Sequence, residues 1–133
     1  MIYALLMVLL GPAWAQEHSV AVTSDVAITT LEKTQLRRLF TGQDDAWSDG
    51  REVQLILPPM DSEAMAWLSS TILGLPPDLY HRYLLEKAYR AGRAPPRVVE
   101  SMDQILEESQ AVPAVLTVLP LPVGTGFHVV RIN

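Results

Sequence analysis

Apolar and polar residues follow two different periods along this chain. Branched apolar residues stand among small and polar ones in segment 19–28, and apolar residues occupy alternate positions in segment 53–57, so both segments are predicted to be strands. Segment 114–119 is a continuous apolar run, which is typical of a strand covered on both faces. The Gly124-Thr125-Gly126 turn then leads into a last predicted strand at 127–132.

Between these strands, apolar residues recur at helical spacing. Each such segment begins at a capping residue or a proline and ends at a glycine or a proline, which are the usual helix boundaries. The first predicted helix runs from a Thr-x-x-Glu capping box at 29–32 to Gly42, and the second runs from Asp61 or Ser62 to Gly74. The third runs from Pro76-Pro77 to Gly92, and the fourth runs from a second capping box at 101–104 to Pro113. Segment 93–97, with its two prolines, is expected to be loop or extended chain.

The order of these elements predicts an α/β fold. Strands and helices alternate without an internal repeat or a heptad run, so we expect one three-layer domain with a mostly parallel sheet flanked by helices. In such folds ligands bind at the carboxyl ends of strands, where helix N-termini offer free N–H groups. The predicted strand at 53–57 continues through Pro58-Pro59 into a helix near Ser62. This junction is therefore the first place where we expect a ligand.

The N-terminal segment 1–15 has the pattern of a secretory signal peptide, although it has no basic residue. An apolar run is followed by a Gly-Pro breaker and an Ala-x-Ala cleavage pattern that ends at Ala15. The run is shorter than the roughly 20 apolar residues that span a bilayer. We therefore expect segment 1–15 to be removed on export, leaving residues 16–133 as a periplasmic or secreted domain without stable membrane insertion.

Composition excludes several classes of function. The chain of 133 residues has no cysteine, so disulfides, thiolate metal clusters and cysteine nucleophiles are ruled out. Its net charge of -5 argues against nucleic acid as a partner, because that partner is held largely by Lys and Arg. The three histidines do not stand at metal-ligand spacing, and neither a G-x-S-x-G motif nor a phosphate-binding loop is present. We predict no enzyme activity, no cofactor and no metal site.

Two further groups of residues allow alternative interpretations. Arg90, Arg93 and Arg97 form the main basic cluster, which either contacts an anion or is a solvated helix end. Trp47 and Trp67 are expected to be core residues rather than a ligand platform, since burial is the commoner use of a large aromatic side chain.

Several motifs resemble those of the periplasmic phosphate-binding proteins of ABC importers. Residues 31–42, LEKTQLRRLFTG, resemble that family's L-x-x-x-x-L-R-x-I/L-F-x-G, and segment 47–50 resembles its W-x-D/N-G before a strand. Ile72-Leu73-Gly74 is similar to the family's V-L-G, and segment 113–118 lies where the family has P-G-A-I-G-Y. The resemblance extends from about Val20 to the C-terminus and implies one lobe of a type 2 periplasmic binding protein.

The chain departs from that family at the ligand loop. Where the family has G-S-G-T, this chain has Met60-Asp61-Ser62-Glu63, so only Ser62 carries over. The two carboxylates beside Ser62 would each repel a phosphate by about 1 to 4 kcal/mol near contact. Ala114 and Thr117 replace two glycines of the family. The length also corresponds to one lobe rather than two.

Two functional hypotheses follow. The first is an exported solute-binding-like protein that works with an ABC importer and binds phosphate or another small oxyanion. Its ligand would lie at Ser62 and the helix N-terminus after it, with Thr23, Ser24 and Arg93. The second is a structural or interaction protein of the cell envelope, in which the lobe has lost its ligand and binds a partner protein or a second copy of itself. Asp61 and Glu63 favour the second hypothesis.

Overall fold

The computed structural model describes residues 17–133, so the predicted signal peptide lies outside the described residues. Within this range, no helix combines the length and the apolar composition that a membrane crossing needs. The elements are β1 (His18–Thr23), β2 (Thr30–Leu31), α2 (Lys33–Phe40), β3 (Gln54–Leu57), α3 (Glu63–Leu68), the π-helical turn η1 (Ser69–Leu73), α4 (Pro77–Ala91), β4 (Arg97–Val98), α5 (Met102–Ala111), β5 (Val115–Pro120), β6 (Phe127–Val129) and β7 (Arg131–Ile132).

The main sheet has the strand order β4-β3-β5-β1-β6. β3 pairs in parallel with both β4 and β5, whereas β1 pairs antiparallel with β5 and with β6. All strands of this sheet except β1 therefore run in one direction. The expected α/β fold with a mostly parallel sheet is confirmed, and the reversed direction of β1 was not predicted. β2 and β7 form a separate parallel pair.

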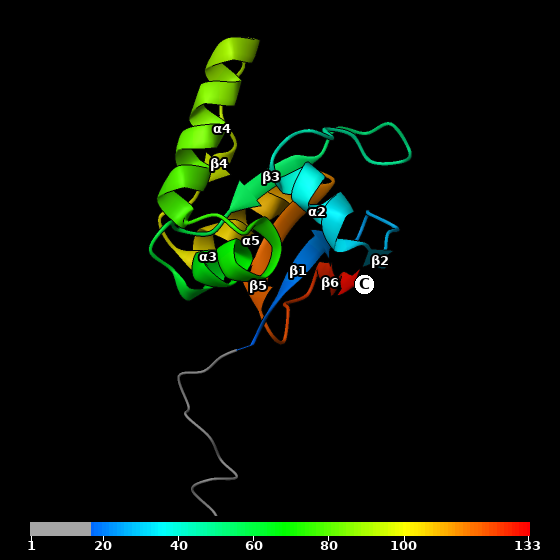
Figure 1. Cartoon of the computed structure of the whole chain (residues 1–133). Helices are drawn as coiled ribbons and strands as arrows, with labels where there is room; N and C mark the ends of the chain where they lie inside the picture. The colour runs from blue at the N-terminus through cyan, green and yellow to red at the C-terminus, as the bar shows by residue number, and fades with distance from the viewer. Residues whose placement is uncertain (1–16) are drawn as a thin grey trace, which may run out of the picture.

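Helices cover both faces of this sheet, which gives the expected three layers (Figure 1). Successive residues of β1 point to opposite faces, as the period of a strand requires. Val20 and Val22 belong to the larger hydrophobic cluster, with residues of α2, α3, η1 and α4. Ala21 belongs to the smaller cluster, which includes Ile105 of α5. The core therefore lies on both sides of the sheet, with α5 alone among the α-helices on its second face.

The helix ends mostly follow the local sequence signals. Ser62 caps α3, and Gly74 and Gly92 end η1 and α4 with φ angles of 69° and 66°. The capping box expected at 29–32 is wrong, because Thr30–Leu31 pairs with β7 instead. α2 is capped by Glu32, whose backbone N–H donates to the Gln35 side chain at 2.9 Å.

The strand predictions differ from the structure in three places. The strand expected over 19–28 ends at Thr23, where the chain turns. β4 follows directly after Pro95-Pro96, in a segment that was expected to be loop or extended chain. The strand expected at 127–132 is divided between β6, which pairs with β1, and β7, which pairs with β2.

Thr117 lies in the middle of β5 and is fully buried, yet its hydroxyl has no hydrogen-bond partner within residues 17–133. A buried polar group without a partner costs about 1 to 3 kcal/mol. Thr117→Val is therefore expected to raise the free energy of unfolding by about 1 to 2 kcal/mol, as measured by urea denaturation.

Thr117→Ser is the matched variant, because it keeps the hydroxyl and removes only the methyl group. It is expected to lower the stability by about 1 kcal/mol. A valine variant less stable than the original chain would show that the hydroxyl is satisfied in solution.

Candidate functional site

The predicted ligand site lies at the carboxyl edge of the parallel strands. β3 and β4 both end at this edge, after Leu57 and Val98, and the chain then enters α3 and α5 respectively. The N–H of Val99 donates to the Leu57 carbonyl at 3.0 Å, which ties the two departing segments together. Two helix N-termini therefore follow neighbouring strands at one edge, which is the arrangement that in α/β folds accompanies ligand binding.

Ser62 is held in place by its own helix. Its hydroxyl donates to the Pro59 carbonyl at 2.6 Å and accepts the Met65 N–H at 3.1 Å. The first-turn N–H groups of Glu63 and Ala64 have no acceptor among residues 17–133. An anion at this point would thus meet two free N–H groups. The Ser62 hydroxyl could donate to the anion as well, but only in place of its bond to the Pro59 carbonyl.

Carboxylates surround this edge. Asp61 and Glu63 flank Ser62, while Glu100 and Asp103 flank the start of α5, and all of them are exposed. Carboxylates accept hydrogen bonds and donate none when ionised. A fully deprotonated oxyanion would be repelled here, whereas an anion that carries a proton can donate it to one of these groups.

Thr23 and Ser24 lie at the opposite edge of the sheet, because β1 runs antiparallel to its neighbours. The Thr23 hydroxyl accepts the N–H of Val115, the first residue of β5, at 3.0 Å. The N–H of Ser24 donates to the Gly126 carbonyl at 2.8 Å, just before β6. In Figure 1 the tip of β1 and the segment that leads into α3 lie at opposite ends of the sheet. The structure therefore does not bring Thr23 and Ser24 together with Ser62.

A polar cluster at this amino edge was missed by the sequence reasoning. Asp25 accepts the Ala114 N–H at 2.9 Å and forms an ion pair with Arg51 at 2.7 Å. Arg51 also contacts Asp49 at 2.8 Å. The hydrogen bond from the Thr23 hydroxyl, followed by those from Ala114 and Arg51, holds the pKa of Asp25 below its ordinary value despite some desolvation. No sequence signal joins these residues, because they come from three separate segments.

Asp25 also borders a cleft of about 340 Å³ together with Thr23, Ser24 and the last turn of α5. The carboxylate and the helix C-terminus both place negative charge beside this cleft. Thr23 and Ser24 thus share a cleft, but its electrostatics do not suit an oxyanion.

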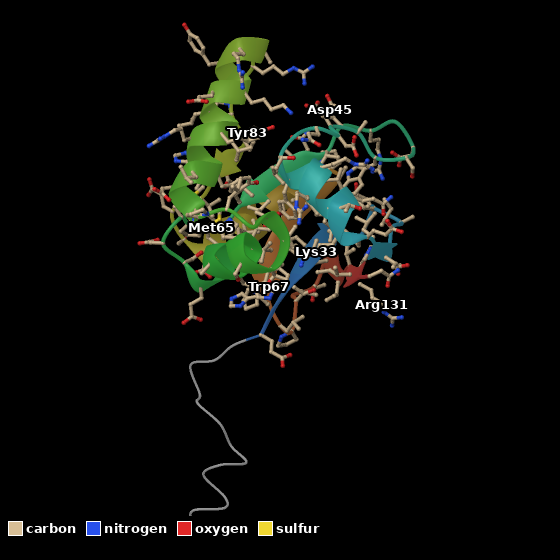
Figure 2. All side chains as sticks on the ribbon, viewed as in Figure 1. Lys33, Asp45, Met65, Trp67, Tyr83 and Arg131 are labelled. Atoms are coloured by element: carbon tan, nitrogen blue, oxygen red, sulfur yellow. The ribbon has the colours of Figure 1, made fainter. Side chains whose placement is uncertain are left out.

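Arg93, which follows α4, lies away from Ser62 and lines a cleft with Glu52, just before β3. Its guanidinium is 3.4 Å from the carboxylate of Asp45, and both side chains are exposed. Arg97 pairs instead with Glu108 of α5 at 2.6 Å. These two arginines therefore contact different carboxylates, although both line one cleft of about 590 Å³. Figure 2 shows Asp45 in the loop between α2 and β3, beside α4.

Neither tryptophan forms a ligand platform. Trp47 is 4% exposed, and its indole Nε1 donates to the Ala114 carbonyl at 3.0 Å, so its expected place in the core is confirmed. Trp67 packs partly buried against the same core from α3, where Figure 2 labels it. Residues 17–133 contain no group of three acidic or histidine side chains that could hold a metal ion.

No protein-family model matches this sequence, and no curated protein is significantly similar to it in sequence. Solved structures do match its fold. An ABC-type phosphate transport receptor from Vibrio cholerae matches 88% of this chain with a TM-score of 0.65 and 11% identity. PstS from Borrelia burgdorferi matches 87% with a TM-score of 0.61 and 13% identity.

A phosphate ABC transporter substrate-binding protein from Clostridium perfringens, solved with bound phosphate, matches 88% of this chain with a TM-score of 0.68 and 11% identity. The alignments cover 46%, 47% and 45% of the three proteins, so this chain spans about half of their length. The expected likeness to one lobe of a phosphate-binding protein is confirmed at the level of the fold.

Proposed function

We propose that this chain is an exported solute-binding-like protein that binds phosphate, or another small protonated oxyanion, at the N-terminus of α3, and that an ABC importer is its partner. The observation that carries the proposal is the fold, which matches phosphate-transport proteins over 87% to 88% of this chain. The position of Ser62 supports it, because a strand-to-helix junction at the carboxyl edge is where such folds hold anions.

The proposed site is smaller than the one expected from the sequence. It keeps Ser62 and the free N–H groups of Glu63 and Ala64, and it leaves out Thr23, Ser24 and Arg93, which lie elsewhere. A single lobe leaves one side of the ligand open to solvent, so we expect a weaker affinity than in a closed cleft.

Asp61 and Glu63 determine which anion is accepted. A carboxylate beside the anion requires a hydrogen-bond donor on it, and phosphate near neutral pH still carries a proton, whereas sulfate does not. Phosphate is therefore expected to bind more tightly than sulfate. In isothermal titration calorimetry, the double variant Asp61→Asn with Glu63→Gln should bind both anions more tightly and lose the preference, because the like-charge repulsion is gone.

Ser62→Gly tests the site itself. Glycine at a helix N-cap costs only a few tenths of a kcal/mol in stability, so this variant removes the hydroxyl without unfolding α3. Loss of a hydrogen bond to a charged group should weaken phosphate binding about tenfold or more. The matched control is Ser101→Gly, at the start of α5, where the serine side chain makes no capping hydrogen bond.

The sample for this titration is the chain expressed in full and recovered from the periplasm, and its intact mass shows whether segment 1–15 has been removed. Recovery of the uncleaved chain from the cytoplasm would contradict export. Absence of heat with phosphate, or equal affinities in Ser62→Gly and in the original chain, would contradict the binding site.

A second candidate function is a structural or interaction role in the cell envelope. It is favoured by one observation, namely that the Ser62 hydroxyl already has both a donor and an acceptor within the chain while carboxylates flank it. Capture of one envelope protein by the purified chain, together with an absence of binding to phosphate and sulfate, would support this role. A clean monomer that captures nothing would contradict it.

A further inference from the structure

α4 has one buried and one exposed face. Tyr80, Leu84 and Ala88, spaced four residues apart, are buried against the rest of the molecule. Figure 2 shows Tyr83 on the side of the helix that faces the body, and Figure 1 shows the C-terminal half of α4 projecting beyond the other helices. The opposite face has no covering element within residues 17–133.

Large apolar side chains lie on this exposed face. Leu79 and Leu85 are each 43% exposed, and Tyr89 is 86% exposed. Charged side chains lie among them at helical spacing. We call the α4 stripe the set of exposed residues Asp78, Leu79, Arg82, Leu85, Glu86, Tyr89 and Arg93. Tyrosine and arginine are enriched in protein interfaces, so the exposed Tyr89 with arginines on the same helix face is typical of an interface.

The charges of the stripe are almost unused within the chain. Asp78, Arg82 and Glu86 form no ion pair among residues 17–133. Arg93 has only the 3.4 Å contact with Asp45, between two exposed side chains, and such surface pairs contribute little. These groups are therefore free to pair with another molecule.

The charges at the two ends of the stripe, Asp78 and Arg93, are opposite in sign, so the stripe is complementary to itself at its ends. Suppose that two copies of α4 pack antiparallel around a two-fold axis that passes between Leu85 and Glu86. The numbers of two facing residues, one from each copy, then add up to 171. Asp78 then lies at the end of the partner's α4, where the partner's Arg93 follows two residues after the helix. Arg82 faces the partner's Tyr89, which allows a cation–π contact. A parallel pair would instead place equal charges against each other.

A groove beside the stripe fits this arrangement. It has a volume of about 600 Å³ and is lined by Ala88, Arg90 and Pro95 together with the stripe residues Leu85, Glu86, Tyr89 and Arg93. In the antiparallel pair, the partner's Leu79 lies opposite position 92, at this groove. We propose that the chain forms a two-fold symmetric homodimer through antiparallel packing of its α4 stripes, with the partner's Leu79 seated in the groove. This proposal is independent of anion binding, which lies on another part of the molecule.

Cysteine cross-linking tests the geometry, since the chain has no cysteine of its own. Leu85→Cys places one thiol beside the two-fold axis in each subunit, so mild oxidation of the full chain is expected to convert most of it into a covalent dimer on a non-reducing gel. Leu106→Cys is the control, because Leu106 of α5 is 40% exposed and lies outside the stripe. Equal cross-linking of both variants, or none of Leu85→Cys, would overturn the proposal.

A charge swap tests the register. Asp78→Arg alone places two positive groups at each end of the pair, and Arg93→Asp alone places two negative groups there. Each single variant is therefore expected to weaken dimerisation about tenfold, as measured by sedimentation equilibrium. The double variant should restore the original affinity. Glu107→Arg, on α5 and outside the stripe, should leave it unchanged. If the original chain is a monomer at about 100 µM, a concentration ample for a specific homodimer, the antiparallel dimer is refuted. A double variant that does not recover the original affinity would refute it as well.

Discussion

Trp47→Ala is expected to lower the free energy of unfolding by about 3 to 5 kcal/mol, which is a large part of the stability of a small domain. Trp47 is 4% exposed and comes from the loop between α2 and β3. Its backbone N–H donates to the Arg51 carbonyl at 2.8 Å, and its indole reaches the Ala114 carbonyl before β5. The side chain therefore attaches a long loop to the start of the central strand β5.

Trp47→Phe separates packing from hydrogen bonding. The Ala114 carbonyl keeps a second donor, the backbone N–H of Gln54 at 3.1 Å, so loss of the indole bond leaves no unsatisfied group. We expect this variant to cost about 1 to 2 kcal/mol, including some lost volume.

Urea denaturation followed by circular dichroism measures both Trp47 variants without relying on tryptophan fluorescence. The control is Trp67→Ala, whose half-buried side chain should contribute less. An alanine variant of Trp47 that loses no more stability than Trp67→Ala would show that Trp47 is not part of the core in solution.

Tyr80→Ala is the second substitution expected to cost about 3 to 5 kcal/mol. Tyr80 is fully buried at the start of α4, and its hydroxyl donates to the Phe40 carbonyl at the end of α2. Burial raises the pKa of Tyr80 well above its ordinary value. The phenol thus stays neutral, and its single donor holds the two helices together.

Tyr80→Phe removes only that donor. The Phe40 carbonyl would be left without a partner among residues 17–133, which costs about 1 to 3 kcal/mol. Tyr83→Phe, three residues further along α4, serves as the control, because the Tyr83 hydroxyl has no partner within residues 17–133 and should cost less than about 0.5 kcal/mol. Thermal unfolding of all three variants checks the order, and a Tyr80→Phe variant as stable as Tyr83→Phe would contradict the hydrogen bond.

The start and end of most helices could be predicted from the sequence because the determining contacts are local. Ser62 caps α3 through a bond to Met65, three residues away, and Gly92 ends α4 because its left-handed backbone suits glycine. The capping box expected at 29–32 failed because a long-range contact competed with it. Leu31 and Thr30 pair with β7 near the other end of the chain, which moves the helix start to Glu32.

The candidate site could be predicted only in its local part. Ser62, Asp61 and Glu63 are neighbours in sequence, so their juxtaposition before α3 needed no tertiary information. Thr23 is the last residue of β1, whereas the first hypothesis placed it at the same ligand site as Ser62. The direction of β1 places it at the opposite edge, and strand direction depends on pairing with β5, almost a hundred residues away.

By itself, the sequence determined the α/β class, most helix boundaries and the acidic surroundings of Ser62, because hydrophobic period, caps and charges act over a few residues. Only the tertiary structure decided which residues share an edge, that Asp25 joins Arg51 and Ala114, and that one face of α4 stays uncovered. Such contacts join segments far apart in the chain, and their formation depends on the whole sheet rather than on any local preference.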